Sequence, residues 1–497
     1  MRSQPPSAVI HGNPVKRRLA KVIARVDAQW LALAVVLLAA VLFRVHDLSR
    51  TSISLDEAVS WKQARLPFFE MLSATAHDNY PPLHNLILHI TIALFGDSEL
   101  ALRAPSALFG IATVGLIGML GTVLWGRTTG LLAALFLAMS GYHVWYSTEA
   151  RMYSLFAFTS TLFVYMVVQL ACRPKWTTVA GCAAAGTALL YTHFYGIFVF
   201  VGVGVFVFFA LARQAAWMRT SRVEWLIAQA VPIIVFLPWA IILVHRTRRV
   251  LLKGFWIPDP TGEFVLQSLA KLAGGEITLI IISVLAFLSV MNLGRGTHGS
   301  DRLVHRPQPD WQIGIVLTWL ITPFIGGYLF SIVGKPILLD RYLICALPAG
   351  VLLAARGCTT LASHKLIFTL AVACVVFAAV PNLNYQAFFR LRPDVRAAMQ
   401  EFAAQYRPSD KVIFVEHVQI PSQYYYRNSI VDSMSVQPEE LSLTEIEASR
   451  LWIIIRDASP QSLQSLKSGL PAAYKMEFEK SWRHGPHLLL LIRSPTT

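Results

Sequence analysis

The 497-residue sequence contains few charged residues. Only 14% of its residues are Asp, Glu, Lys or Arg, against about 25% in an ordinary soluble domain, and 55% are hydrophobic. This balance excludes a typical soluble protein and predicts an integral membrane protein. Acidic residues are scarcer than basic ones, with 28 Asp and Glu against 43 Lys and Arg, so the formal net charge is +15. The positive excess favours anionic lipid and phosphate as partners. Since no nucleic-acid-binding motif accompanies it, nucleic acid is excluded.

Cysteine is also scarce. The five cysteines lie in or next to apolar runs, and none has the CxxC spacing of a metal site; they are Cys172, Cys182, Cys345, Cys358 and Cys374. We expect them to be small core residues. The sequence has no internal repeat, and it lacks a phosphate-binding loop of the G-x-x-x-x-G-K type, which argues against a bound nucleotide.

Long apolar runs are abundant. Crossing a hydrocarbon core of about 30 Å takes about 20 residues, and about eleven runs reach this length with help from their flanks: 30–46, 104–125, 131–146, 154–172, 176–191, 194–211, 223–244, 275–291, 313–333, 342–355 and 366–380. A single helix over 176–211 would be longer than the bilayer is thick, so we expect a turn at 192–196. That turn places His193 at a membrane surface.

The basic residues predict how the runs are oriented. Segment 1–29 carries Lys16, Arg17, Arg18, Lys21 and Arg25, as a secretory signal does. Because this leader is long and no small-x-small cleavage site follows the first run, we expect a cytoplasmic segment and an uncleaved anchor.

The apolar run 83–95 has only about 13 residues, which is too short to cross, so we expect it to lie in the interface. Most short basic loops then fall in the cytoplasm, as the positive-inside rule requires. These loops hold Arg127, Arg173, Lys175, Arg213, Arg219, Arg222, Arg295, Arg302, Arg306, Arg356 and Lys365. Four cations, Arg246, Arg248, Arg249 and Lys253, fall outside and contradict the rule.

This topology gathers ten charged or titratable residues on the outer side of the membrane: Asp56, Glu57, Asp78, Arg103, Glu149, Arg151, His193, Lys335, Asp340 and Arg341. We predict that these ends of the apolar runs converge on one polar site. The loop 47–103 is expected to be the main part of it, within a membrane domain of residues 30–384.

The tail, residues 385–497, has the composition of a soluble domain. Short apolar runs of strand length lie at 411–416, 451–456 and 487–492, and helical patterns lie at 395–406 and 460–466. We expect a small α/β domain on the outer face.

Two adjacent acids, Asp56 and Glu57, follow the first apolar run. Ser54-x-x-Glu57 fits a capping box, and Asp56 in a first helical turn is favoured by the helix dipole. An acid at a bilayer surface can also hold a pKa suited to removing a hydroxyl proton. The two interpretations are compatible, because a cap also fixes the position of the acid.

Other polar clusters each have a structural and a chemical interpretation. Tyr80-Pro81-Pro82 is a stiff segment from which a helix can start, and it presents His77, Asp78 and His84 beside that helix. A zinc site at His77, His84 and His89 is disfavoured because their spacings match no ligand signature.

The cations Arg151, Lys335 and Arg341 either snorkel to the membrane surface and pair with acids such as Glu149, or bind a phosphate whose lipid tail lies in the bilayer. Their number at one surface, beside carboxylates, favours the phosphate. His193 alone is more typical of a satisfied interfacial histidine.

The order of these motifs resembles bacterial family 39 glycosyltransferases of the GT-C superfold, which include the protein O-mannosyltransferases and the lipid A aminoarabinose transferase as relatives. The resemblance covers residues 30–380. The motifs that carry it are Leu55-Asp56-Glu57-Ala58, Asn79-Tyr80-Pro81-Pro82-Leu83-His84, Glu99 to Arg103 with Pro105-Ser106-Ala107-Leu108-Phe109-Gly110, Glu149-Ala150-Arg151-Met152-Tyr153, His193-Phe194-Tyr195-Gly196 and Arg341-Tyr342-Leu343.

The resemblance implies a polytopic α-helical GT-C enzyme of the inner (plasma) membrane with an extracytoplasmic active site. It would move a sugar, with inversion, from a polyprenyl-phosphate carrier to a lipid, glycan or protein acceptor. Asp56 would be the general base with Glu57 beside it, and Arg151, Lys335 and Arg341 would bind the donor phosphate. Asp78, His84, Arg103, Glu149, His193 and Asp340 are further site candidates.

Two features bear on this implied chemistry. Some relatives have His where this chain has Tyr80, so the family's acceptor role for that position does not carry over directly. A divalent ion at Asp56 and Glu57 is an alternative to a metal-free site, and no other cofactor is implied. The absence of a nucleotide-phosphate loop fits a lipid-linked donor.

A flippase or transporter of a lipid-linked sugar is the alternative function. Its signature would be ionisable residues near the middle of spans and paired repeats with broken helices. The charges of this chain lie instead at the ends of the runs. A receptor or scaffold is a third possibility, and it leaves the acid pair unexplained.

Overall fold

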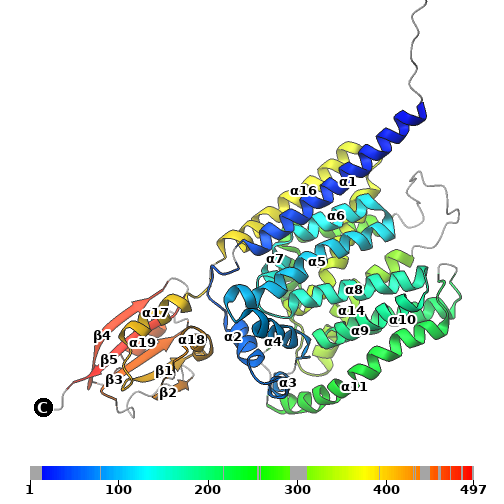
Figure 1. Ribbon diagram of the computed structural model, residues 1–497. Helices are drawn as coiled ribbons and strands as arrows, with labels where there is room; N and C mark the ends of the chain where they lie inside the picture. Colours follow the sequence, from blue (N-terminus) through cyan, green and yellow to red (C-terminus); the bar gives the residue numbers. More distant parts are fainter. Residues whose placement is uncertain are drawn as a thin grey trace, which may run out of the picture.

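The computed structural model describes residues 14–494 except 47, 79, 216–217, 254–256, 258, 292–310, 391, 429, 431, 437–447, 457–459, 469, 471 and 483–484; side chains are also undescribed at 14–27, 246–253, 460–462 and 465. A helical body is followed by a small mixed sheet at the end of the body that holds α2 (Figure 1). Arg295, Arg302 and Arg306 lie outside the described residues, as do the side chains of Lys16, Arg246 and their basic neighbours.

The body consists of α1 (Pro14–Val45), α2 (Leu55–Ala64), α3 (Phe68–His77), α4 (Leu83–Phe95), α5 (Glu99–Trp125), α6 (Arg127–Ala138), α7 (Gly141–Ser147), α8 (Tyr153–Cys172), α9 (Trp176–Thr192), α10 (Gly196–Ala212), α11 (Arg222–Lys253), α12 (Gly262–Ala273), α13 (Glu276–Met291), α14 (Trp311–Val333), η1 (Asp340–Ala346), α15 (Leu347–Thr360), α16 (Lys365–Asn384) and η2 (Tyr385–Phe389). Each apolar run of the sequence forms one or two of these elements.

The described helices that could each cross a membrane are fewer than the expected spans. Among the described residues, seven helices are long and apolar enough to cross a membrane, or eight if the bent pair α12 and α13 forms one span. The expected count of about eleven is therefore not confirmed. Helices α9 and α10 have 17 residues each, and at 1.5 Å per residue such a helix is only about 26 Å long.

The run 131–146 does not form a single helix. It breaks between α6 and α7, where Ser140 adopts an extended backbone and its hydroxyl accepts a hydrogen bond from the His143 amide. A serine at this position caps a new helix because its oxygen satisfies an otherwise unpaired amide. The expected turn after α9 is present, and His193 lies in it.

The first loop folds into three short helices, α2, α3 and α4. Ser54 and Glu57 form the capping box that the sequence predicts: the Glu57 amide donates to the Ser54 hydroxyl (3.3 Å), and the Ser54 amide donates to the Glu57 carboxylate (2.8 Å). Helix α4 has 13 residues and ends at Gly96, which has a positive φ of 76°. This length is too short for a span, as expected.

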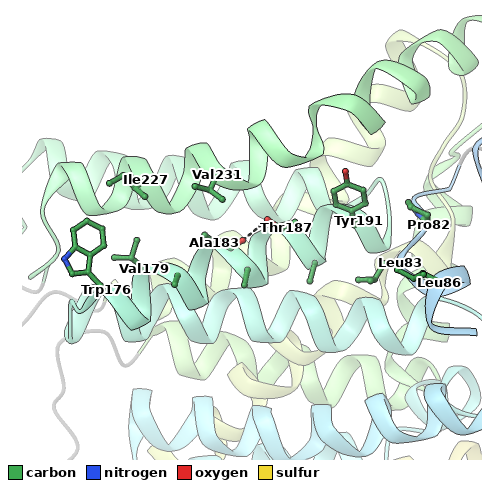
Figure 2. A pocket seen from close by; sticks show the side chains of 13 residues that line it. Pro82, Leu83, Leu86, Trp176, Val179, Ala183, Thr187, Tyr191, Ile227 and Val231 are labelled. Atoms are coloured by element: carbon green, nitrogen blue, oxygen red, sulfur yellow. Dashed lines mark hydrogen bonds between the residues drawn. The ribbon is translucent and has the colours of Figure 1, made fainter. Parts of the chain in front are cut away.

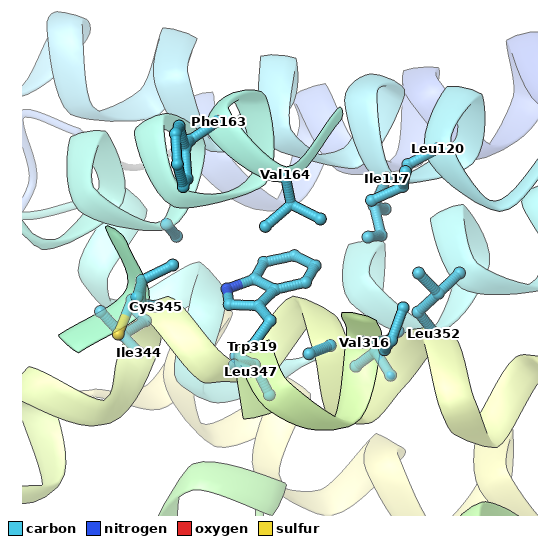
Figure 3. Close-up of a cluster of buried hydrophobic side chains, with 14 of the residues drawn as sticks. Ile117, Leu120, Phe163, Val164, Val316, Trp319, Ile344, Cys345, Leu347 and Leu352 are labelled. Atoms are coloured by element: carbon cyan, nitrogen blue, oxygen red, sulfur yellow. The ribbon is translucent and has the colours of Figure 1, made fainter. Parts of the chain in front are cut away.

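The largest core lies between the long helices. Figure 3 shows the fully buried Trp319 of α14 between Val164 of α8 and Leu352 of α15, with Ile117 of α5 nearby. Small residues allow the helices to approach closely. Gly357 of α15 faces the backbone of Leu285 in α13, where an added Cβ would overlap the Leu285 carbonyl.

The C-terminal sheet has five strands in the order β2-β1-β3-β5-β4. β1 (Lys411–Val415) pairs in parallel with β2 (Asp432–Val436) and β3 (Arg450–Ile455), and β5 (His487–Arg493) pairs antiparallel with β3 and β4 (Tyr474–Ser481). Helices α17 (Val395–Gln405), α18 (Gln419–Tyr425) and α19 (Pro460–Ser468) accompany the sheet. The small α/β tail is thus present, with three elements, α18, β2 and β4, that the sequence analysis missed.

We expect the substitution Gly357→Ala to destabilise the helical body by about 1–3 kcal/mol, because the added methyl group overpacks the contact between α15 and α13. Thermal unfolding of the purified protein in detergent measures this. The matched control is Gly262→Ala, since nothing lies within 4 Å of a Cβ at Gly262. Equal unfolding temperatures for the two variants would contradict the close approach.

Candidate functional site

Asp56, in the first turn of α2, lies between two arginines. Arg341 Nη1 is 3.5 Å from Asp56 Oδ2, and the side chains of Asp56 and Arg341 are 49% and 25% exposed. Arg151 Nη1 donates to the Asp56 carbonyl (3.3 Å) and to the Ser60 hydroxyl (3.1 Å). A solvent-accessible carboxylate therefore sits beside two cations that come from sequence positions far apart.

The neighbouring acid, Glu57, is fully buried. Its carboxylate accepts hydrogen bonds from Arg103 Nε (2.7 Å) and Nη2 (3.0 Å), from Arg392 Nη1, and from the amides of Ser54 (2.8 Å) and Ala150 (3.0 Å). Burial by itself raises the pKa of Glu57, but Arg103 and Arg392 outweigh this and hold the pKa well below its ordinary value. Glu57 is thus ionised at neutral pH and holds four parts of the chain together.

Aromatic rings lie against both cations, the buried Arg151 and the partly exposed Arg341. The Arg151 guanidinium lies 5.4 Å from the centre of the Tyr80 ring and 6.0 Å from that of Tyr153, within the range of a cation–π contact. The hydroxyls of Tyr80 and Tyr342 are 3.1 Å apart. These rings and the guanidinium groups of Arg151 and Arg341 form one wall that carries both positive charge and hydroxyl groups.

His193 belongs to this wall. Its ring is fully buried, stacks on Phe156 at 4.8 Å between centroids and lies 4.7 Å from Tyr342. Burial lowers the pKa of His193 well below its ordinary value, and Arg151 and Arg341 add to the effect. A neutral, packed imidazole agrees with the structural interpretation of this residue.

His84 and Asp78 flank the Pro-Pro motif. His84 is buried, and its pKa is lowered to about 3 by burial and by Arg151; within the described part of the chain its Nε2 atom has no hydrogen-bond partner. Asp78 is exposed and accepts a hydrogen bond from Gln63 (3.0 Å). His84 is therefore a neutral group beside Arg151, and Asp78 lies on the outer rim.

The remaining candidates, Glu149, Asp340 and Lys335, form no hydrogen bond or ion pair with Asp56. Glu149 accepts from Arg390 Nη2 (2.6 Å) and from Trp145 Nε1 (2.9 Å). Asp340 pairs with Lys271 (3.6 Å). Lys335 forms no hydrogen bond or ion pair with any described residue, so the structure does not join it to the other cations.

An apolar groove of about 820 Å³ begins beside the site. Figure 2 shows it running along α9 from Tyr191, near Pro82 and Leu83, to Trp176 at the far end of the helix, with Val231 of α11 on the opposite wall. Small side chains of α9, such as Ala183, leave the space open. The groove therefore connects the Pro-Pro motif to the apolar surface of the body.

The sequence analysis missed Arg390 and Arg392, which follow the last long helix and pair with Glu149 and Glu57. It also assigned no role to Tyr153 or Tyr342. The sequence does contain two arginines, two residues apart, after the last apolar run. They were overlooked because all residues after 384 were assigned to a separate domain.

The described residues contain no group of three or more His, Cys, Asp or Glu side chains that could hold a metal ion. A cation shared by Asp56 and Glu57 does not fit this arrangement, because both Glu57 oxygens already accept hydrogen bonds from arginine.

We expect Glu57→Gln to lower stability by about 3–5 kcal/mol at neutral pH, because it leaves buried arginines without their counter-charge. The stabilisation by Glu57 is complete above the pKa of the unfolded chain, about 4.3, and is lost as the pH falls toward the depressed pKa of the folded state. The difference in unfolding temperature between wild type and variant should therefore narrow in acid.

The control is Glu479→Gln on the C-terminal sheet, where the lost pair with Lys467 is 34–38% exposed and contributes less than about 1 kcal/mol. A pH-independent difference between wild type and Glu57→Gln would show that the charge of Glu57 does not stabilise the fold.

Comparisons with known proteins bear on this geometry. Residues 79–242, 164 of 497, match the family described as dolichyl-phosphate-mannose-protein mannosyltransferase. A search of curated protein sequences gives no match.

Among solved structures, ArnT from Cupriavidus metallidurans bound to undecaprenyl phosphate aligns with a TM-score of 0.60 and 13% identity, over 93% of this chain and 97% of that one. The archaeal oligosaccharyltransferase AglB from Archaeoglobus fulgidus, in complex with an inhibitory peptide and a dolichol-phosphate, aligns with a TM-score of 0.52 and 11% identity, over 82% and 64%. The chain thus has the membrane-protein fold of these structures, the GT-C fold, and its residues 79–242 are similar to the mannosyltransferase family.

Proposed function

We propose that this protein is an inverting glycosyltransferase that moves a sugar from a polyprenyl-phosphate carrier to a hydroxyl group of an acceptor on the outer face of the membrane. The observation that carries the proposal is the accessible Asp56 carboxylate 3.5 Å from Arg341, with Arg151 bonded to the Asp56 carbonyl. One carboxylate and two cations are the groups that the reaction needs.

The cations suit the leaving group. A sugar on a polyprenyl phosphate departs with a phosphate that already carries negative charge, so it needs cationic stabilisation more than a proton. Arg341 is the more exposed of the two arginines and Arg151 is buried. Arg341 can therefore turn from Asp56 to an incoming phosphate, while Arg151 keeps its contacts to α2.

The carboxylate suits the acceptor. Asp56 takes the proton of the acceptor hydroxyl, whose oxygen attacks the anomeric carbon as the bond from that carbon to the phosphate oxygen breaks. The electron pair of the broken bond stays on the phosphate, which leaves on the carrier. Attack from the face opposite the phosphate inverts the anomeric centre.

The groove along α9 suits the carrier's tail. It is lined by apolar side chains and starts at Pro82, two residues from Tyr80, whose ring lies against Arg151. A lipid with its phosphate at Arg151 and Arg341 can thus lay its isoprenoid chain between α9 and α11. The similar fold of ArnT, solved with undecaprenyl phosphate, supports this class of ligand.

Asp56→Asn removes the proposed base while nearly keeping its shape. We expect kcat with a polyprenyl-phosphate sugar to fall at least 100-fold, because general bases contribute about 10²–10⁴ to the rate. Donor binding should persist. The control is Asp259→Asn, at an exposed position before α12. Wild-type turnover by Asp56→Asn would refute the assignment of Asp56 as the base.

Arg341→Ala removes an accessible cation from the proposed phosphate site. We expect the affinity for polyprenyl phosphate to weaken by about 10-fold or more, since a hydrogen bond to a charged group contributes about 1.5–3 kcal/mol. Binding of the lipid in nanodiscs measures this, with the exposed Arg213→Ala as control. Unchanged affinity would remove Arg341 from the site.

Reporter fusions test the side of the membrane on which the site lies. The topology expected from the basic loops places Arg127, at the start of α6, in the cytoplasm and Arg151, before α8, outside. A fusion after Arg127 should therefore report the cytoplasm and a fusion after Arg151 the outer side. A cytoplasmic signal after Arg151 would exclude transfer on the outer face.

A further inference from the structure

In the stretch that joins η2 to α17, two arginines contact the helical body. Arg390 lies over the Trp145 ring at 4.0 Å and pairs with Glu149 at 2.6 Å. The side chain of Arg392 is more buried than that of Arg390, with only 6% of it exposed against 17%. This stretch therefore does more than connect the membrane helices to the C-terminal sheet.

The guanidinium of Arg392 contacts two segments at once. Its Nη1 donates to Glu57, and its Nη2 donates to the Thr148 carbonyl (3.3 Å) and lies 3.5 Å from Glu149 Oε1. Glu57 is the residue after Asp56, and Thr148 is three residues before Arg151. One side chain thus links the segment that carries the proposed base to the segment that carries a proposed phosphate ligand.

Charge balance alone does not explain Arg392. Arg103 already neutralises Glu57 through two hydrogen bonds to its carboxylate. A second buried cation costs desolvation, and burial lowers the pKa of Arg392 against the opposing effect of Glu57. What Arg392 adds is contact with the segment before Arg151, through the hydrogen bond to Thr148 and the ion pair with Glu149, neither of which Arg103 makes.

We propose that Arg392 is a positioning residue that fixes the spacing of Asp56 and Arg151, so that the stretch leading to the C-terminal domain forms part of the transferase site. This inference rests on the proposed function of Asp56 and Arg151. It assigns no chemical step to Arg392, which acts through Glu57 and the backbone of Thr148.

The C-terminal domain is held to the body by separate contacts. Tyr424 donates to the Asp97 carbonyl (2.7 Å), Tyr425 donates to Glu99 Oε1 (2.9 Å), and Arg427 pairs with Asp97 (2.9 Å). The side chain of Arg427 touches neither Glu57 nor residues 148–151. Arg427→Gln is therefore a matched control that loses an arginine pair at the same interface.

The experiment compares Arg392→Gln, Arg392→Lys and Arg427→Gln in the full chain. Arg392→Gln should lower kcat about 100-fold, because a displacement of about 1 Å at reacting groups has this effect, and the KM for the acceptor should change far less. Arg392→Lys should recover part of kcat, since an ammonium reaches Glu57 but cannot also donate like a planar guanidinium. Arg427→Gln should keep wild-type kcat.

Two further readouts separate a local effect of Arg392 from a general loss of stability. Glu57→Gln combined with Arg392→Gln should be no slower than the worse single variant, because residues that act as one unit are not additive. Hydrogen exchange of residues 54–60 and 148–152 should rise in Arg392→Gln and stay unchanged in Arg427→Gln.

Wild-type kcat or wild-type exchange in Arg392→Gln would overturn the proposal, and so would equal losses of kcat in Arg392→Gln and Arg427→Gln, which would assign the effect to domain docking. If the wild-type protein transfers no sugar from polyprenyl phosphate, the proposed function fails, while the exchange measurement still decides whether Arg392 joins the two segments.

Discussion

The buried carboxylate of Glu57 is the interaction on which the rest of the site depends. It accepts hydrogen bonds from Arg103 of α5, from Arg392 and from the amides of Ser54 and Ala150. A buried charge is stable only when it is paired and fully hydrogen-bonded. Because these partners come from four segments, satisfying one carboxylate fixes the relative positions of α2, α5, the segment before α8 and the stretch before α17.

This constraint separates the roles of two acids that are adjacent in the chain. Consecutive residues on a helix point about 100° apart, since 3.6 residues complete a turn. Glu57 therefore points into the body, while Asp56 points toward Arg341 and solvent. An acid held in place by a buried neighbour is preorganised, and catalytic groups depend on such preorganisation.

The surroundings of Asp56 divide into a cationic wall and an apolar groove. Arg151 and Arg341, with the rings of Tyr80 and Tyr342, provide charge and hydrogen-bonding groups, and the groove along α9 provides an apolar path from Pro82. A ligand with a charged head and an isoprenoid tail is complementary to both at once. This combination favours a lipid-linked donor over a soluble one.

The sequence by itself determined the membrane character, the short α4, the capping box at Ser54, the turn at His193 and the small α/β tail, because each follows from a local pattern or a length. It could not show that Lys335 makes no hydrogen bond or ion pair with a described residue, or that the run 131–146 breaks at Ser140 into two short helices. It missed β2, whose segment 432–436 has only two apolar residues, Met434 and Val436, and is mostly exposed. Only the tertiary structure revealed Arg392 beside Glu57, 335 positions away, because no local pattern encodes which distant cation will satisfy a buried acid.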